Sequence, residues 1–79
     1  MKFDELVFKY DVDNYDVYFI IVTDADENLK TTAFHIDYYV NDEILRNKYK
    51  NEKVVSYSIL KNDDTQNMYI SVMLLLEYQ

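Results

Sequence analysis

The segment YDVYFIIVT, residues 15–23, is apolar at most positions and decides the fold. Alternate side chains of a β-strand point to opposite faces of a sheet. The two faces of this segment would carry Val17, Phe19 and Ile21, and Tyr18, Ile20 and Val22, respectively. Two apolar faces are typical of a strand that lies inside a sheet, so Tyr15–Thr23 is predicted to be a central strand.

Alternating apolar residues predict further strands on both sides of this segment. They lie at Leu6–Val12, Phe34–Val40, Val54–Leu60 and Met68–Tyr78. The pair Asp13-Asn14 suits a hairpin turn between the first two strands, although Lys2–Phe8 is also compatible with a short helix. Because the chain has neither glycine nor proline, clusters of Asn and Asp are expected to form its turns.

Residues 41–51 break the alternation and predict one helix of about three turns. Asn41 is a suitable N-cap, two acidic residues follow it, and Lys48 and Lys50 lie near the other end, which complements the helix dipole. The predicted order of elements is βββαββ. We therefore expect an α+β fold with a small antiparallel sheet and one short helix packed on one face. The whole chain, residues 1–79, is expected to form a single domain.

Composition excludes several classes of protein. The hydrophobic fraction of 49% and the aromatic fraction of 16% are too high for a disordered chain. The absence of cysteine excludes disulfides and thiolate metal sites. The longest apolar stretch, Met68–Leu76, is too short to span a bilayer, and the charged start does not resemble a signal peptide. We expect a cytoplasmic protein that does not contact a membrane.

Negative charge is concentrated in the first third of the chain. The net charge is −7, and residues 1–28 account for −6 of it. Those residues hold two lysines and eight acids: Asp4, Glu5, Asp11, Asp13, Asp16, Asp24, Asp26 and Glu27. Such a field disfavours direct binding of nucleic acid and favours a basic protein surface as the partner.

His35, the single histidine, is the first candidate for catalysis. It precedes Asp37 by two residues, which places both on the less apolar face of the predicted third strand. A general base also needs a nucleophile or a substrate pocket, and the chain offers no cysteine, no nucleophile-elbow serine and no glycine-rich loop. An exposed histidine on the sheet is the favoured interpretation. We expect no enzymatic activity and no cofactor.

The acidic segment Asp24–Asn28 is a candidate metal site. Its residues match the first three side-chain ligands of a calcium loop, but Leu29 stands where the loop needs glycine and His35 where it needs glutamate. The flanking segments also have the pattern of strands, whereas an EF-hand has helices there. The segment is interpreted as an acidic hairpin loop, and no metal site is expected.

Tyrosine is abundant, with nine residues in 79. So many rings do not all fit in the core of so small a domain, so some are expected at the surface, where tyrosine is a common contact residue. Tyr15 and Tyr39 are the predicted partner contacts. The alternative is that tyrosine serves as an amphipathic residue of the sheet. Base stacking on single-stranded nucleic acid would also use such rings, but it requires a basic groove.

A small, acidic, single-domain chain without catalytic motifs resembles the phage-encoded inhibitors that include anti-CRISPR proteins and DNA-mimic anti-restriction proteins. The resemblance covers the general character of the whole chain. It implies a non-enzymatic inhibitor that binds the basic nucleic-acid-binding surface of a host nuclease or CRISPR effector in the host cytoplasm. The acids that support DNA mimicry, and are predicted to contact the partner, are Asp11, Asp13, Asp16, Asp24, Asp26 and Glu27.

Two alternatives remain open at this point. An immunity protein or antitoxin that neutralises a basic toxin has the same charge requirements. A homodimeric assembly module is the other alternative, because Tyr15–Thr23 and Met68–Tyr78 offer more apolar surface than one short helix covers. In that case the C-terminal strand is expected to be an edge strand that pairs with a second copy.

Overall fold

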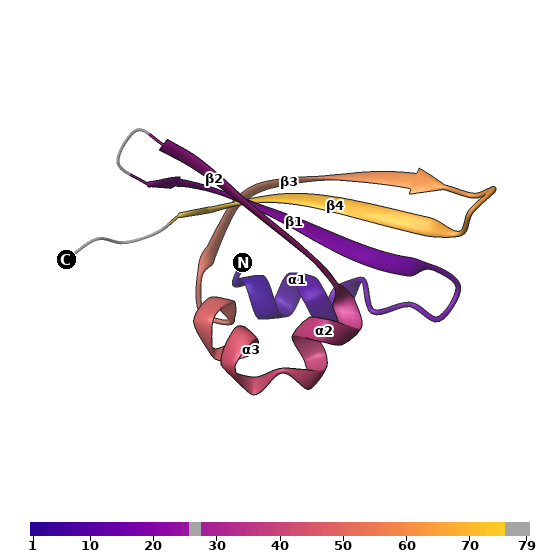
Figure 1. The fold of residues 1–79 in the computed structure, drawn as a ribbon, viewed down its shortest axis with the longest axis horizontal. Coiled ribbons are helices and arrows are strands. Elements are labelled where there is room, and N and C mark those ends of the chain that lie inside the picture. Colours follow the sequence, from indigo (N-terminus) through magenta and orange to yellow (C-terminus); the bar gives the residue numbers. More distant parts are fainter. Residues whose placement is uncertain (26–27, 76–79) are drawn as a thin grey trace.

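The computed structural model describes residues 1–25 and 28–75 (Figure 1). The side chains of residues 24–30 are outside this description. The elements are, in chain order, α1 (Phe3–Lys9), β1 (Asp16–Ala25), β2 (Asn28–His35), α2 (Ile36–Asn41), α3 (Glu43–Tyr49), β3 (Lys53–Asn62) and β4 (Asn67–Leu75). The α+β class is confirmed, but the order of elements differs from the predicted βββαββ.

The four strands form one mixed sheet in the order β2-β1-β4-β3. The pairs β1–β2 and β3–β4 are antiparallel, and the two hairpins join through a parallel pairing of β1 with β4. The prediction of a purely antiparallel sheet is therefore wrong. The parallel pair arises because α2 and α3 carry the chain from the end of β2 to the far edge of the sheet (Figure 1).

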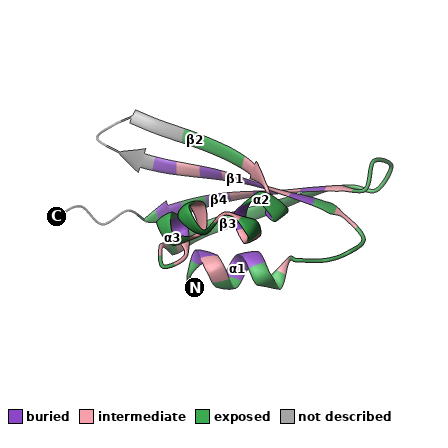
Figure 2. Ribbon diagram, turned by 60° about the horizontal axis from the view of Figure 1, so that its bottom comes forward, coloured by how far each residue is buried: buried purple, intermediate pink, exposed green. Residues whose placement is uncertain are grey.

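The core lies between the sheet and the three helices, which all pack on the same face (Figure 2). Phe3 of α1 is at its centre and is fully buried. Its ring makes edge contacts with Phe19, Phe34, Tyr39 and Tyr49 at centroid distances of 5.5, 6.3, 5.3 and 6.1 Å. One aromatic ring thus joins α1 to both other helices and to two strands.

The predicted first strand, Leu6–Val12, is wrong because Phe3–Lys9 forms a helix. The alternative helix for Lys2–Phe8 is the correct interpretation. Phe3, Leu6 and Val7 are spaced by three and four residues, and all three are buried against the sheet. Asp13 and Asn14 do lie in a turn, but that turn joins a helix to a strand.

The predicted third strand, Phe34–Val40, is also wrong, since β2 ends at His35 and α2 begins at Ile36. The His35 ring caps the helix, because its Nδ1 accepts a hydrogen bond of 3.1 Å from the backbone N–H of Asp37. Ile36 and Tyr39 are both buried and lie three residues apart, so a helix spacing was present within the apparent alternation.

Two short helices replace the single predicted helix at residues 41–51. Asn41 is the last residue of α2, and Asp42 is the N-cap of α3. The Asp42 carboxylate accepts hydrogen bonds from the backbone N–H groups of Ile44 and Leu45, at 3.0 and 3.2 Å. The cap therefore lies one residue later than predicted.

The last two predicted strands are confirmed as β3 and β4, with a turn between Asn62 and Asn67. Gln66 has a φ of 57° in this turn, a left-handed conformation that glycine usually adopts. β4 is a central strand, so its prediction as an edge strand is wrong. The predicted end of this strand, at 76–78, lies outside the described residues.

Within the described residues, no helix is long and apolar enough to cross a membrane.

Candidate functional site

Segments that carry six carboxylates meet at one end of the molecule, which we call the acidic end. They belong to the α1–β1 connection, the start of β1, the first turn of α2 and the β3–β4 turn: Asp11, Asp13, Asp16, Asp37, Asp63 and Asp64. The α1–β1 connection and the β3–β4 turn lie close together at the right of Figure 1. Two hydrogen bonds join them, from the Tyr15 hydroxyl to Asp63 at 2.6 Å and from the Asp16 N–H to the Gln66 carbonyl at 2.8 Å.

His35 lies beside two of these carboxylates. Its Nε2 lies 3.3 Å from an oxygen of Asp16, and its Nδ1 lies 3.7 Å from an oxygen of Asp37. Since Nδ1 also accepts the Asp37 N–H, the contacts fit the tautomer whose proton is on Nε2. The histidine therefore holds β1 and α2 together, which is a structural role. His35 is expected from the sequence to lie exposed on the sheet. Its ring is only partly exposed, because it packs edge-on against Tyr18.

Tyr15 is half-buried within the acidic end. The hydrogen bond to Asp63 raises the pKa of the Tyr15 hydroxyl, and partial burial raises it further. The ammonium group of Lys61 lies 5.5 Å from the ring centroid. The hydroxyl is thus occupied by Asp63, and Tyr15 supports the acidic end from within.

The six acids predicted to contact a partner do not form one group. Asp16 begins β1 and Asp24 is its penultimate residue, so they lie roughly 26 Å apart at about 3.3 Å per residue. Asp26 and Glu27 lie outside the described residues. Asp63 and Asp64 were missed because they belong to the C-terminal third. The sequence indicates only a turn for residues 62–67, and the pairing of β1 with β4 is what brings this turn beside Asp16.

Tyr39 was predicted to be an exposed contact, and this is wrong because the residue is fully buried. Its hydroxyl donates a 2.8 Å hydrogen bond to Asp4. Burial and this hydrogen bond raise the pKa of Tyr39 well above its usual value. Asp4 also accepts two hydrogen bonds of 3.1 Å from Arg46. Burial raises the pKa of Asp4, but the hydrogen bonds from Arg46 and Tyr39 outweigh burial and lower it overall. Asp4 is therefore structural and lies apart from the acidic end.

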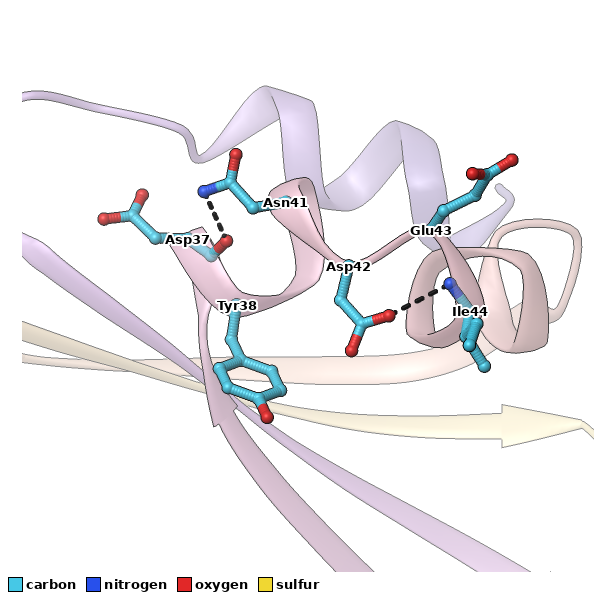
Figure 3. A pocket seen from close by; sticks show the side chains of 6 residues that line it. All are labelled: Asp37, Tyr38, Asn41, Asp42, Glu43 and Ile44. Atoms are coloured by element: carbon cyan, nitrogen blue, oxygen red, sulfur yellow. Dashed lines mark hydrogen bonds between the residues drawn. The ribbon is translucent and has the colours of Figure 1, made fainter.

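A shallow hollow lies between α2 and α3 and is lined by Asp37, Tyr38, Asn41, Asp42, Glu43 and Ile44 (Figure 3). Tyr38 is 65% exposed and Ile44 is 84% exposed. Asn41 donates to the Asp37 carbonyl at 2.9 Å, which fixes one wall. The hollow thus combines three carboxylates with two exposed apolar side chains, and it meets the acidic end at Asp37. We call it the interhelix hollow.

The face of the sheet opposite the helices carries a second surface, the open sheet face. Strand register places these side chains on it: Tyr18, Ile20, Val22, Thr31, Ala33, His35, Ser56, Ser58, Leu60, Tyr69, Ser71 and Met73. No helix of the described residues covers this face (Figures 1 and 2). Tyr18 and Tyr69 stack on each other, with centroids 5.5 Å apart. The face of each ring that meets the other is therefore not available for stacking a base.

Within the described residues, no three His, Cys, Asp or Glu side chains are grouped to hold a metal ion. The expectation of an acidic hairpin at Asp24–Asn28 fits the flanking strands β1 and β2, although its central residues are not described. Comparison with protein-family models, curated proteins and solved structures gave no match to this chain. Function is therefore inferred from the geometry of the acidic end, the interhelix hollow and the open sheet face.

Proposed function

We propose that this protein is a non-enzymatic inhibitor that binds the basic nucleic-acid-binding surface of another protein, such as a host nuclease or CRISPR effector. The observation that supports this proposal is the acidic end. Four separate segments that carry carboxylates meet there. His35 bonds to the Asp16 carboxylate and to the backbone N–H of Asp37, and Tyr15 bonds to Asp63. α1 and β3 both end beside the acidic end, and the basic residues at these two ends are Lys9 and Lys61.

The acidic end suits a surface that normally grips phosphates. Exposed carboxylates on neighbouring segments present acceptor oxygens to Lys and Arg side chains, and they displace the same counterions that DNA displaces. The field of the acidic end also accelerates association with a basic protein. Binding is then expected to weaken steeply with salt and to exclude DNA.

The interhelix hollow supplies the apolar part of the proposed contact. Tyr38 and Ile44 are exposed, and Asp37, Asp42 and Glu43 surround them with negative charge. An arginine or lysine of the partner fits such a place, since its stem packs on apolar side chains while its head meets a carboxylate. Tyr38 replaces Tyr39 as the proposed aromatic anchor.

Two triple variants with the same change of charge test which acids act. The first changes Asp11, Asp13 and Asp64 to Asn at the acidic end. The matched control changes Asp24 and Asp26 to Asn and Glu27 to Gln in the β1–β2 hairpin. Purified CRISPR effectors and restriction nucleases serve as probes, and competition with labelled DNA is followed by fluorescence anisotropy at several salt concentrations.

The wild-type protein is expected to compete with DNA for at least one probe, more strongly at low salt. The acidic-end variant should lose most of this competition, and the hairpin control should keep it. Equal loss in both variants would show that net charge acts without the acidic end. No competition with any probe at low salt would contradict the nuclease and effector class.

The acidic end also fits a basic toxin, so an immunity protein or antitoxin is the second candidate. The two functions differ in what they protect. Co-expression that rescues cell growth from a basic toxin, in a strain without nuclease-based defence, would favour the second candidate.

A further inference from the structure

We propose that the open sheet face is the interface of a homodimer, in which two copies pack sheet against sheet with their strands antiparallel. This proposal goes beyond the binding of a basic partner and does not rest on it. It replaces the predicted pairing of the C-terminal strand at a sheet edge, since β4 is central.

The open sheet face is apolar and only half-buried in one copy. Leu60 is 69% exposed and Met73 is 40% exposed, and Tyr18, Ile20 and Tyr69 are intermediate. On the other face of the central strands β1 and β4, the helices bury side chains such as Phe19 and Ile70 completely. An uncovered sheet face of this kind marks an interaction surface.

The lack of charged side chains favours a second copy of this chain as the partner that covers the open sheet face. Among the twelve side chains that define the open sheet face, none is Asp, Glu, Lys or Arg. By the same register, Asp16 and Lys53 stand at its rim. A chain with a net charge of −7 repels its own copies over an acidic surface, so the copies meet most favourably on a neutral one. A basic partner, in contrast, gains most at the acidic end.

The open sheet face is also complementary to itself. Tyr18, Tyr69 and Leu60 are register partners on three adjacent strands and form a row of bulky side chains, which we call the ridge. One row further along, a hollow lies between β3 and β4, and Ser56, Ser58 and Ser71 are among its lining residues. A two-fold axis between these rows, perpendicular to the strands, places the ridge of each copy over the hollow of the other.

The area suffices for a stable contact. Four strands about 4.8 Å apart, each about nine residues long at about 3.3 Å per residue, span roughly 550 Å². Two copies therefore bury roughly 1,100 Å², compared with about 1,000 Å² for a specific interface. Packed sheets lie about 10 Å apart, and their side chains interdigitate at that distance.

The antiparallel arrangement follows from the acidic ends. If the strands of the two copies ran parallel, the two acidic ends would lie beside each other and repel. In the antiparallel arrangement they point in opposite directions. The dimer then presents two separate acidic ends, each accessible to a basic partner.

The oligomeric state tests this proposal, with Leu60→Lys as the disruptive variant and Ile44→Lys as its control. Both residues are exposed and apolar, and both variants add one positive charge, but Ile44 lies on α3, away from the open sheet face. Light scattering after size exclusion is expected to give twice the 9.6 kDa chain mass for the wild type and the control. Leu60→Lys is expected to give the monomer mass, with an unchanged circular dichroism spectrum. A monomeric wild type would overturn the proposal, and so would a dimeric Leu60→Lys.

Cross-linking provides a second measurement that does not depend on disrupting the dimer. Because the chain has no cysteine, Ser71→Cys introduces a single thiol near the proposed axis, and Asn47→Cys introduces one on α3 as the control. A short bismaleimide should cross-link Ser71→Cys into dimers and leave Asn47→Cys monomeric on a denaturing gel. Cross-linking of the control alone would assign the interface to the helical side and overturn the proposal.

Discussion

Arg46 of α3 donates two hydrogen bonds of 3.1 Å to the carboxylate of Asp4 in α1, through Nε and Nη2. The buried Tyr39 hydroxyl of α2 donates to the same carboxylate. One acidic side chain thus fastens all three helices together on the face of the sheet that they cover. Its energetic contribution can be measured through its dependence on pH.

Replacing Asp4 by Asn should destabilise the fold by about 1 kcal/mol at neutral pH. This value is at the low end for hydrogen bonds to a charged group, because Arg46 is 40% exposed and partly screened. Folding lowers the pKa of Asp4 below its value of 3.8. Its contribution is therefore present above that pH and is lost as the pH falls through the lower, folded pKa. Urea unfolding of wild type and variant should show that the difference in their free energies of unfolding is smaller at acidic pH than at neutral pH.

The exposed Asp13 provides the control for this experiment, since it lies in the α1–β1 connection. Asp13→Asn is expected to leave the free energy of unfolding within about 0.5 kcal/mol of wild type. An Asp4→Asn variant as stable as Asp13→Asn at neutral pH would contradict the role of Asp4 in fastening the helices.

Phe3 should be the most sensitive position of α1. Phe3→Ala is expected to cost about 3–5 kcal/mol, because it empties a fully buried site ringed by four aromatic side chains. For a chain of this size that loss approaches the whole stability. Phe8→Ala on the same helix is the matched control, since Phe8 is 46% exposed. Thermal unfolding by circular dichroism should separate the two variants clearly, and similar midpoints would be inconsistent with the burial of Phe3.

Asp42→Ala should destabilise the protein by about 1 kcal/mol, because it removes the N-cap of α3. Asn41 was the cap expected from the sequence, but its side chain bonds to the Asp37 carbonyl instead. Asn41→Ala should therefore cost less than Asp42→Ala in chemical denaturation. The reverse order would place the start of α3 one residue earlier.

Alkaline pH should destabilise the protein through its tyrosines. The pKa of Tyr39 is raised in the folded state by burial and by Asp4, so its contribution is complete below the ordinary tyrosine pKa of 10.0. That contribution is lost as the pH rises, because the unfolded chain ionises first. Tyr39→Phe should show a smaller loss of stability above pH 10.0 than wild type, as measured by urea unfolding at increasing pH. An unchanged loss would indicate that Tyr39 titrates as an exposed tyrosine.

The local sequence correctly predicted the elements whose pattern of apolar and polar residues is complete within the segment itself. Tyr15–Thr23 is apolar on both faces and forms a central strand, and Val54–Leu60 lies within β3. The cluster of Asn and Asp at 62–67 forms the turn between β3 and β4. In each case the alternation or the turn chemistry is complete within the segment, so no distant contact was needed to interpret it.

The segments that were predicted wrongly fit two structures locally. Leu6–Val12 and Phe34–Val40 both alternate, but Phe3, Leu6 and Val7, and likewise Ile36 and Tyr39, also match one face of a helix. Packing against the sheet favours the helix, because Phe3 of α1 then lies against Phe19 of β1 and Phe34 of β2. Tyr39 of α2 likewise lies against Phe34. Short periodic segments do not distinguish these outcomes without their tertiary contacts.

The sequence by itself determined that the chain is acidic, with most of its charge before residue 29, and that its central strand has two apolar faces. Only the tertiary structure decided which acids meet and which apolar face stays uncovered. The parallel pairing of β1 with β4 sets Asp63 beside Tyr15, directly before Asp16, whereas Asp24 is at the far end of β1. The physical reason is that charge and alternation are properties of neighbouring residues, whereas strand pairing joins residues about 50 positions apart through long-range burial.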